Sequence, residues 1–158
     1  MKKFSLLLLA IAISLVFTVS CVSPASKHVR QGDVYFEQGQ WDQATVEYEA
    51  ALELDSELQI NDKLADAYAR RAEVHFDNKE YDKAIATCEK AFILLPTVEI
   101  SPKLADAYVQ RAETHFSSGD YDKAIADYNK AIKLAPKEAS SFTGGETPIL
   151  IKEIWTKR

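Results

Sequence analysis

The sequence predicts an all-α protein, an α-solenoid of three helical hairpins with a repeat period of about 40 residues. The segment 63–96 recurs at 103–136, where a gap-free alignment leaves 21 of 34 positions identical, and a more diverged copy lies one period upstream. Within each copy, apolar and small residues recur three and four positions apart, in two runs separated by a short polar break. A repeated unit of this size indicates hairpins that bury their apolar faces against one another.

The first hairpin is expected over residues 25–58. Ser23 and Pro24 have the chemistry of a helix cap and a first helical residue, because proline lacks only a donor that would be unpaired there. Gly39 falls where the first helix of this hairpin must stop, and glycine tolerates the left-handed conformation that such a stop requires.

The second and third hairpins are expected over residues 62–96 and 102–136. Asn61 and Ser101 are the predicted helix caps, and Ile60, directly before its cap, is expected to pack onto the turn that follows, as is Ile100. Pro96 and Pro136 are expected to close the second helices.

The turns inside these two hairpins differ in sequence. The turn position is Gly39 in the first copy and Gly119 in the third copy, but it is Lys79 in the second copy. A strained or differently shaped turn is therefore expected at Lys79.

These residues resemble the tetratricopeptide repeat, whose pattern places small, aromatic, Gly-x-Tyr, alanine and proline positions at set spacings. The third copy carries the pattern at Ala112, His115, Gly119, Tyr121, Ala124, Tyr128, Ala131 and Pro136. The resemblance covers about Ala25 to Pro136, in three copies of constant register. One departure is the period of about 40 residues, where the family has 34. Because the added residues lie between hairpins, the first helices are expected to begin about one turn early.

Residues 1–20 are expected to form a lipoprotein signal peptide, and residues 21–136 the repeat domain. Lys2 and Lys3 precede an uncharged run from Phe4 to Val22, which is the layout of a secretory leader. The segment TVSC at 18–21 is similar to the bacterial lipobox, in which the cysteine is acylated and the leader is cut before it. This resemblance implies a lipid anchor at Cys21, with the outer membrane facing the periplasm favoured and the cell surface as the alternative.

Two alternatives to lipidation stay open. The uncharged run of 19 residues is long enough to cross a bilayer as an uncleaved anchor, and a soluble secreted form is the other alternative. Removal of the two leader lysines would change the net charge from −5 to −7. A chain this acidic is not expected to bind nucleic acid.

Tetratricopeptide repeats generally bind extended peptides or partner helices along the concave surface that the first helix of each hairpin lines. By position, the resemblance implies a partner-binding surface at Asp33, Phe36, Asp66, Glu73, Phe76, Asp106, Glu113 and Phe116. This acidic trough with an aromatic stripe favours a protein segment that carries lysine or arginine beside an apolar anchor. The family's clamp for a C-terminal carboxylate uses lysine and asparagine at these places, so the acids argue against such a ligand.

The same side chains also have a purely structural interpretation. Asp66 and Glu73 flank Arg70 at spacings of four and three, which is typical of exposed pairs within a helix. The phenylalanines would then pack against a neighbouring hairpin. Cys88 stands where the other copies carry tyrosine, and an inert buried thiol is expected there.

No arrangement of residues indicates an enzyme, a metal site or a cofactor. His75 and His115 replace the family's aromatic residue, and the carboxylates are spread by the repeat rather than gathered in a pair. The predicted function is a membrane-anchored protein-interaction scaffold in the bacterial envelope. The alternative is an accessory ligand-binding subunit of an envelope transport system.

Residues 137–158 are expected to form a polar linker and a short capping segment. Thr147 and Pro148 have the chemistry of another cap and first turn, and Ile151, Ile154 and Trp155 would face the end of the stack. A tail that orders only on a partner is the alternative.

Overall fold

A computed structural model describes residues 23–96 and 100–136, apart from the side chain of Ile100. Six helices form three hairpins in this part of the chain: α2 (Pro24–Glu37) with α3 (Trp41–Leu54), α4 (Asn61–Asp77) with α5 (Tyr81–Leu94), and α6 (Ile100–Ser117) with α7 (Tyr121–Leu134). No strand occurs among these residues, and the all-α prediction is confirmed. The leader, Cys21 and the expected capping helix lie outside the described residues.

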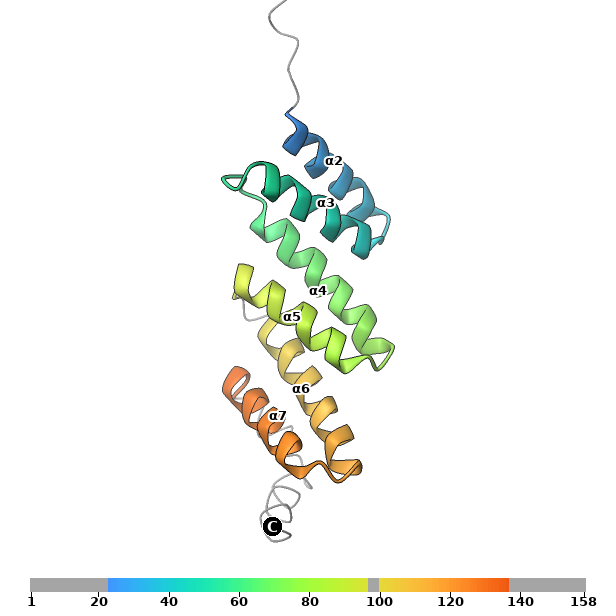
Figure 1. The fold of residues 1–158 in the computed structure, drawn as a ribbon, viewed down its shortest axis with the longest axis vertical. Coiled ribbons are helices and arrows are strands. Elements are labelled where there is room, and N and C mark those ends of the chain that lie inside the picture. Colours follow the sequence, from blue (N-terminus) through green and yellow to red (C-terminus); the bar gives the residue numbers. More distant parts are fainter. Residues whose placement is uncertain (1–22, 97–99, 137–158) are drawn as a thin grey trace, which may run out of the picture.

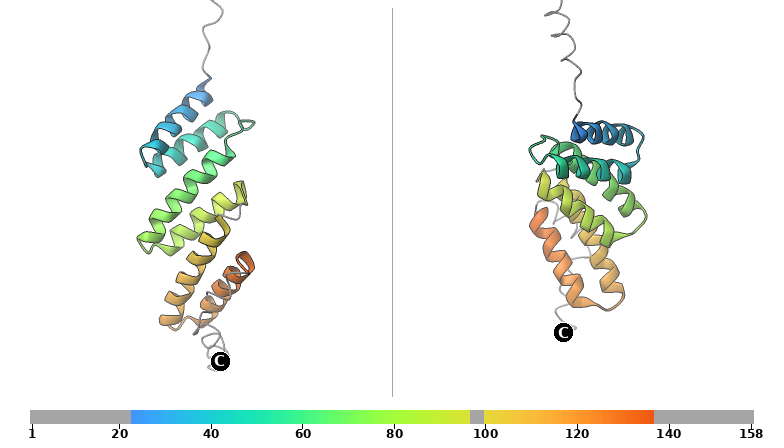
Figure 2. Two further views of the ribbon diagram at one scale, coloured as in Figure 1. Left: turned by 180° about the vertical axis from the view of Figure 1, so that it is seen from behind. Right: turned by 45° about the horizontal axis from the view of Figure 1, so that its top comes forward.

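The helices are stacked in chain order along the long axis of the molecule (Figure 1). The same order is visible from behind and with the top of the molecule tilted forward (Figure 2). Contacts are most extensive inside each hairpin, and the next most extensive join α3 to α4 and α5 to α6. Each hairpin therefore packs on its neighbour in sequence, as a solenoid requires.

The core between the helices consists mainly of alanine and tyrosine. Ala44, Ala84 and Ala124, at equivalent places in the three second helices, are at most 1% exposed. Such small side chains let neighbouring helices approach closely. One cluster joins the first two hairpins and another joins the last two, and Phe92 of α5 packs against both clusters.

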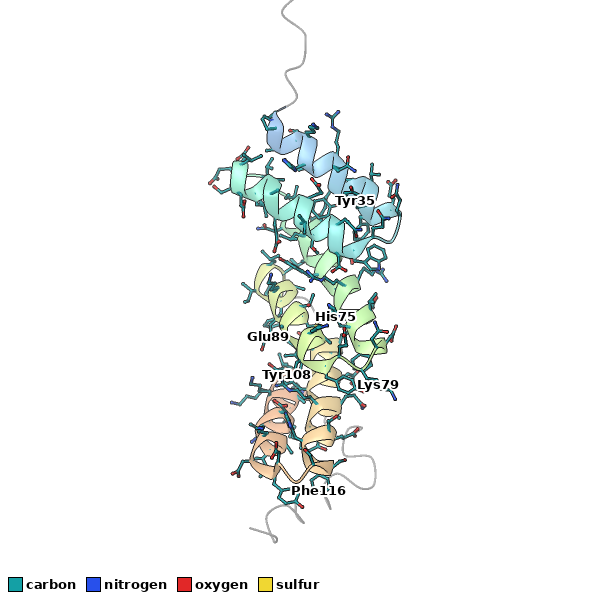
Figure 3. The ribbon with its side chains drawn as sticks, turned by 45° about the vertical axis from the view of Figure 1, so that its right-hand side comes forward. Tyr35, His75, Lys79, Glu89, Tyr108 and Phe116 are labelled. Atoms are coloured by element: carbon teal, nitrogen blue, oxygen red, sulfur yellow. The ribbon has the colours of Figure 1, made fainter. Side chains whose placement is uncertain are left out.

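The turn inside each hairpin has the same conformation in all three copies. The φ angles are 72° at Gly39, 59° at Lys79 and 84° at Gly119. The Lys79 amide donates to the Phe76 carbonyl at 2.8 Å, and both glycines make the equivalent bond at 3.0 Å. The expectation of a different shape at Lys79, the residue labelled in Figure 3, is therefore wrong. The expected strain is present, because a lysine adopts the left-handed region there.

The helix starts agree with the predictions only in part. Ser23 caps α2 as predicted, accepting from the Ser26 amide at 3.1 Å. The caps predicted at Asn61 and Ser101 are wrong, because both residues already lie inside the helix. Ile60, which is 6% exposed, precedes α4, so apolar packing fixes that start in place of a side-chain hydrogen bond. The expected lengthening is confirmed, since α4 and α6 have 17 and 18 residues and α2 has 14.

Candidate functional site

The eight predicted partner-binding residues all lie on the first helices of the hairpins. They are Asp33 and Phe36 on α2, Asp66, Glu73 and Phe76 on α4, and Asp106, Glu113 and Phe116 on α6. The structure brings Glu73, Phe76 and Asp106 together around one pocket between α4 and α6, which we call the α4–α6 pocket. The other five residues do not line this pocket.

Each phenylalanine of the predicted stripe packs edge-to-face against the aromatic residue that opens the second helix of its own hairpin. The ring centroids lie 5.0 Å apart for Phe36 and Trp41, 5.7 Å for Phe76 and Tyr81, and 5.4 Å for Phe116 and Tyr121. All three phenylalanines are half-buried. They support the turn within a hairpin and still leave part of each ring open to a partner.

Lysines from the next hairpin lie against two of the predicted carboxylates. Lys63 of α4 donates to Asp33 at 2.8 Å, and Lys103 of α6 contacts Glu73 in the same way. The sequence contains a signal for these pairs, because each lysine follows its acid by 30 residues. The trough is consequently less acidic than predicted.

Arg70 forms the intrahelical pairs that the structural interpretation anticipated. It lies 3.8 Å from Asp66 and 3.5 Å from Glu73, and all three side chains are more than a third exposed. Solvent screening limits such pairs to a few tenths of a kcal/mol each. Among the described residues, Glu113 forms no ion pair, and its exposed carboxylate stays available.

A second set of contacts between hairpins was not apparent from the sequence. The hydroxyls of Tyr68 and Tyr108 donate to Glu49 and Glu89 of the preceding hairpin. Burial, and then the adjoining carboxylate, raise the pKa of both phenols above the usual range. Figure 3 shows Tyr108 and Glu89 close together where the second and third hairpins meet. These bonds connect α4 to α3 and α6 to α5.

Arg111 connects three helices at the end of the stack. Its Nε and Nη2 atoms donate to the two oxygens of Asp127, both at 2.7 Å, and its Nη1 atom donates to Asp82 at 2.7 Å. The bonds to the carboxylates, that to Asp127 foremost, raise the pKa of the guanidinium. The Asp127 side chain is only 6% exposed, so this pair stabilises the packing of α6 on α7.

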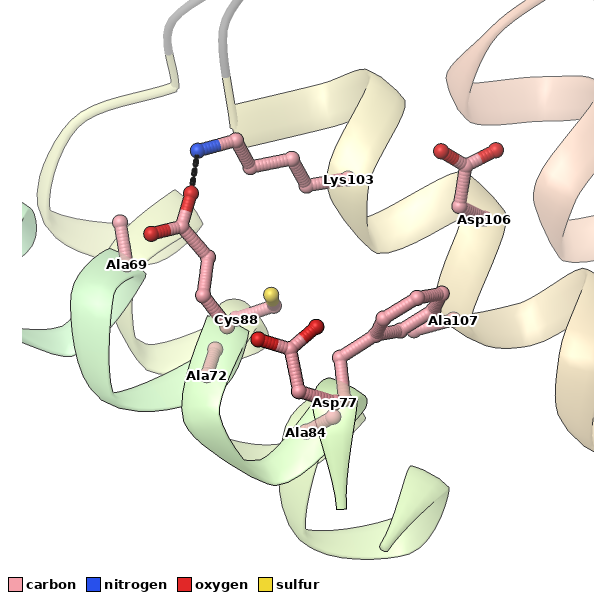
Figure 4. A pocket seen from close by; sticks show the side chains of 10 residues that line it. Ala69, Ala72, Asp77, Ala84, Cys88, Lys103, Asp106 and Ala107 are labelled. Carbon is pink, nitrogen blue, oxygen red and sulfur yellow. Dashed lines mark hydrogen bonds and ion pairs between the residues drawn. The ribbon is translucent and has the colours of Figure 1, made fainter. Parts of the chain in front are cut away.

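The α4–α6 pocket has a small apolar floor and a charged rim. Its volume is about 210 Å³, and its floor includes Ala72, Ala84, Cys88 and Ala107. Figure 4 shows the Cys88 side chain directed into this space, with the Lys103 ion pair above it. Burial raises the pKa of the Cys88 thiol to about 11, which agrees with the expected unreactive thiol.

Comparison with known proteins identifies the repeat. A family model described as "Tetratricopeptide repeat" matches residues 63–137, and one described as "TPR repeat" matches residues 32–79. The chain belongs to the tetratricopeptide repeat family. Tetratricopeptide repeats mediate protein–protein interaction and generally act as scaffolds without enzymatic activity. Comparison with curated protein sequences gives no match.

Two solved tetratricopeptide repeat structures are similar to this chain. The first TPR of Spaghetti (RPAP3) bound to the HSP90 peptide SRMEEVD is 23% identical, with 76% of this chain and 90% of that chain covered and a TM-score of 0.33. The OM64 TPR domain of Arabidopsis is 22% identical, with 85% and 96% covered and a TM-score of 0.34. At such TM-scores neither likeness bears on the function.

Within residues 23–96 and 100–136, no helix of this tetratricopeptide repeat protein combines the length and the apolar character needed to cross a membrane. The same residues contain no group of three or more His, Cys, Asp or Glu side chains placed to hold a metal ion. His75 and His115, which replace the family's aromatic residue, lie near Glu80 at 2.8 Å and Asp127 at 3.8 Å.

Proposed function

We propose that this tetratricopeptide repeat protein is a membrane-anchored interaction module of the bacterial envelope, without catalytic activity. A partner segment would lie along the face formed by α2, α4 and α6. The observation that carries this proposal is the α4–α6 pocket, where a half-buried ring, Phe76, adjoins the carboxylates of Glu73 and Asp106. An apolar anchor and a cation could both be satisfied there.

The ion pairs refine the chemistry of the proposed partner. Asp33 and Glu73 already hold lysines, so a cation of the partner would have to compete for them. The exposed Glu113 carboxylate has no such competitor among the described residues. We therefore place the partner's lysine or arginine near Glu113 and its apolar anchor at the α4–α6 pocket.

Attachment to the membrane is proposed to occur through a lipid on Cys21. Helix α2 begins at Pro24, three residues further along the chain. A lipid at Cys21 would therefore hold the first hairpin close to the bilayer, with the outer membrane facing the periplasm favoured. The stack would extend from there, with the third hairpin furthest along the chain from the anchor.

The alternative function, a ligand-binding subunit of an envelope transport system, would need a pocket that holds a small molecule. The α4–α6 pocket has a volume of about 210 Å³ and an apolar floor. Typical ligand-binding sites have volumes of about 300 Å³ or larger. A protein segment with one inserted side chain therefore fits the pocket better than a free ligand does.

Site-specific photocrosslinking in intact cells tests the proposed function. A benzophenone amino acid at position 66 would lie on the proposed face, and the same group at Val46 of α3 provides a matched control that is 60% exposed. We expect a protein adduct from position 66 that weakens when Glu113→Lys is added. Equal adducts from both positions, or adducts only from position 46, would contradict the proposal.

A further inference from the structure

The second helices of the three hairpins differ at one buried position. Tyr48, Cys88 and Tyr128 stand there, each one repeat period from the next. In the first hairpin the Tyr48 ring lies directly on Gly32, since a Cβ atom at Gly32 would be 2.6 Å from the ring. The Tyr48 hydroxyl donates to Asp33 at 2.8 Å, so one phenol fills this space and satisfies one carboxylate.

In the second hairpin the corresponding space has no ring. Cys88 replaces the tyrosine, and the α4–α6 pocket lies at this place, with Ala72 at the position of Gly32. Glu73 occupies the position of Asp33 and keeps the equivalent lysine, Lys103. The carboxylate therefore retains its cation and lacks the phenol donor that Asp33 has.

We propose that the α4–α6 pocket receives an aromatic side chain of the protein partner, with tyrosine preferred. The inserted phenol would take the place of the Tyr48 ring and donate its hydroxyl proton to Glu73. An apolar cavity of about 150 Å³ is already large enough to bind benzene, and this pocket measures about 210 Å³. The inference rests on the proposed function, because it specifies the apolar anchor of that partner.

The third hairpin shows that an alanine opposite this position does not exclude a ring. Tyr128 is 5% exposed and coexists with Ala112, the counterpart of Ala72. The carboxylates of Asp77 and Asp106 also line the α4–α6 pocket, so an anionic ring would be repelled. The ligand class is thus a neutral phenol, with an unsubstituted phenyl ring second.

A titration with small probes tests the pocket itself. Full-length protein labelled with ¹⁵N would be titrated with p-cresol, toluene and 4-methylbenzoate, and the amide shifts of Ala72 and Ala107 would be followed by NMR. We expect saturable shifts at these residues, tightest for p-cresol and weakest for 4-methylbenzoate. The absence of saturation, or shifts centred elsewhere in the stack, would overturn the inference.

Variants identify the atoms involved. Cys88→Tyr should abolish p-cresol binding, and the double variant Ala72→Gly with Cys88→Tyr, which reproduces the Gly32 and Tyr48 pair, guards against misfolding. Glu73→Leu should lower the affinity for p-cresol relative to toluene by about tenfold, because the acceptor of the phenol is removed. Unchanged p-cresol binding in the double variant would overturn the assignment.

Crosslinking from position 66 then separates this inference from the proposed function. Loss of the adduct in the double variant supports insertion of a partner ring. An adduct that persists while p-cresol binding is lost overturns the inference and leaves the proposed function standing. If the native chain gives no adduct at all, the proposed function fails, and with it the partner that the inference assigns to this pocket.

Discussion

Lys79 adopts a conformation that the other two repeats assign to glycine. The turn at Lys79 keeps the hydrogen bonds of its glycine counterparts, so the packing of α4 on α5 determines the backbone in spite of the residue. The sequence indicated where the strain would fall. It could not indicate whether the strain would be relieved, because that depends on packing around the turn.

Lys79→Gly is expected to stabilise the protein by about 0.5–1 kcal/mol. A left-handed residue other than glycine costs about 1–2 kcal/mol, and part of the gain is lost because glycine is freer in the unfolded chain. Urea unfolding followed by circular dichroism measures the change. Asn78→Gly is the matched control, since Asn78 has a φ of −78° and gains nothing from glycine; equal stabilisation by both changes would contradict the explanation.

The Cys88 thiol should be unreactive at neutral pH. Its pKa is about 11 in the folded chain against an ordinary value of 9.0, so the reactive thiolate is about a hundredfold scarcer at pH 8 than in the unfolded chain. Because the folded state holds this proton more tightly, the thiol's contribution to stability is fully present below pH 9 and is lost as the pH rises through 11.

The rate of alkylation by iodoacetamide, followed as a function of pH, tests the prediction for Cys88. The rate in native protein should keep rising up to about pH 11, and Cys88→Ser identifies any reaction that belongs to Cys21. A rate that levels off below pH 9 would show that the thiol is not buried as described.

At the scale of elements, the repeat predicted which helices exist and which faces they bury. Ala84 and Ala124 each belong to a run of small and apolar residues at helical spacing, so their burial followed from local pattern alone. The ion pairs between hairpins did not follow, because Lys63 and Asp33 are brought together only by the packing of one hairpin on the next. For this reason the predicted acidic trough proved to be partly neutralised.

Asp127→Asn is expected to destabilise the protein by about 2–3 kcal/mol. The change removes the charge that two Arg111 nitrogens contact, and it leaves a largely buried guanidinium without its main partner. Thermal or urea unfolding gives the magnitude. Asp82→Asn is the control, because the Asp82 side chain contacts the same arginine but is 87% exposed; this variant should lose far less stability. Similar losses from both variants would refute the role of burial.

At the scale of the whole molecule, the sequence predicted the number of hairpins and their stacking in chain order. A regular period in constant register was sufficient, because each unit needs only its neighbours to bury its apolar face. The α4–α6 pocket could not be predicted in the same way. The sequence shows that Cys88 replaces the tyrosine of the other two copies. The volume that the missing ring leaves behind depends on how far the surrounding helices close around it.

Lipidation at Cys21 would set the position of the whole stack at a membrane. Growth with a labelled fatty acid should label the native chain, and Cys21→Ser should abolish the label. The change lies outside the repeats, so the helical circular dichroism signal should be retained. A native chain that lies in the membrane fraction without the label would favour the uncleaved anchor.

Hydrogen exchange followed by mass spectrometry tests the linear stack most directly. The middle hairpin packs on a neighbour at both ends, whereas α2 is covered from one side by the described residues. Amides of α4 should therefore exchange at least about tenfold more slowly than those of α2, because a hairpin at the end of a stack opens at a lower free energy. Equal protection in α2 and α4, or the least protection in the middle hairpin, would contradict the stack.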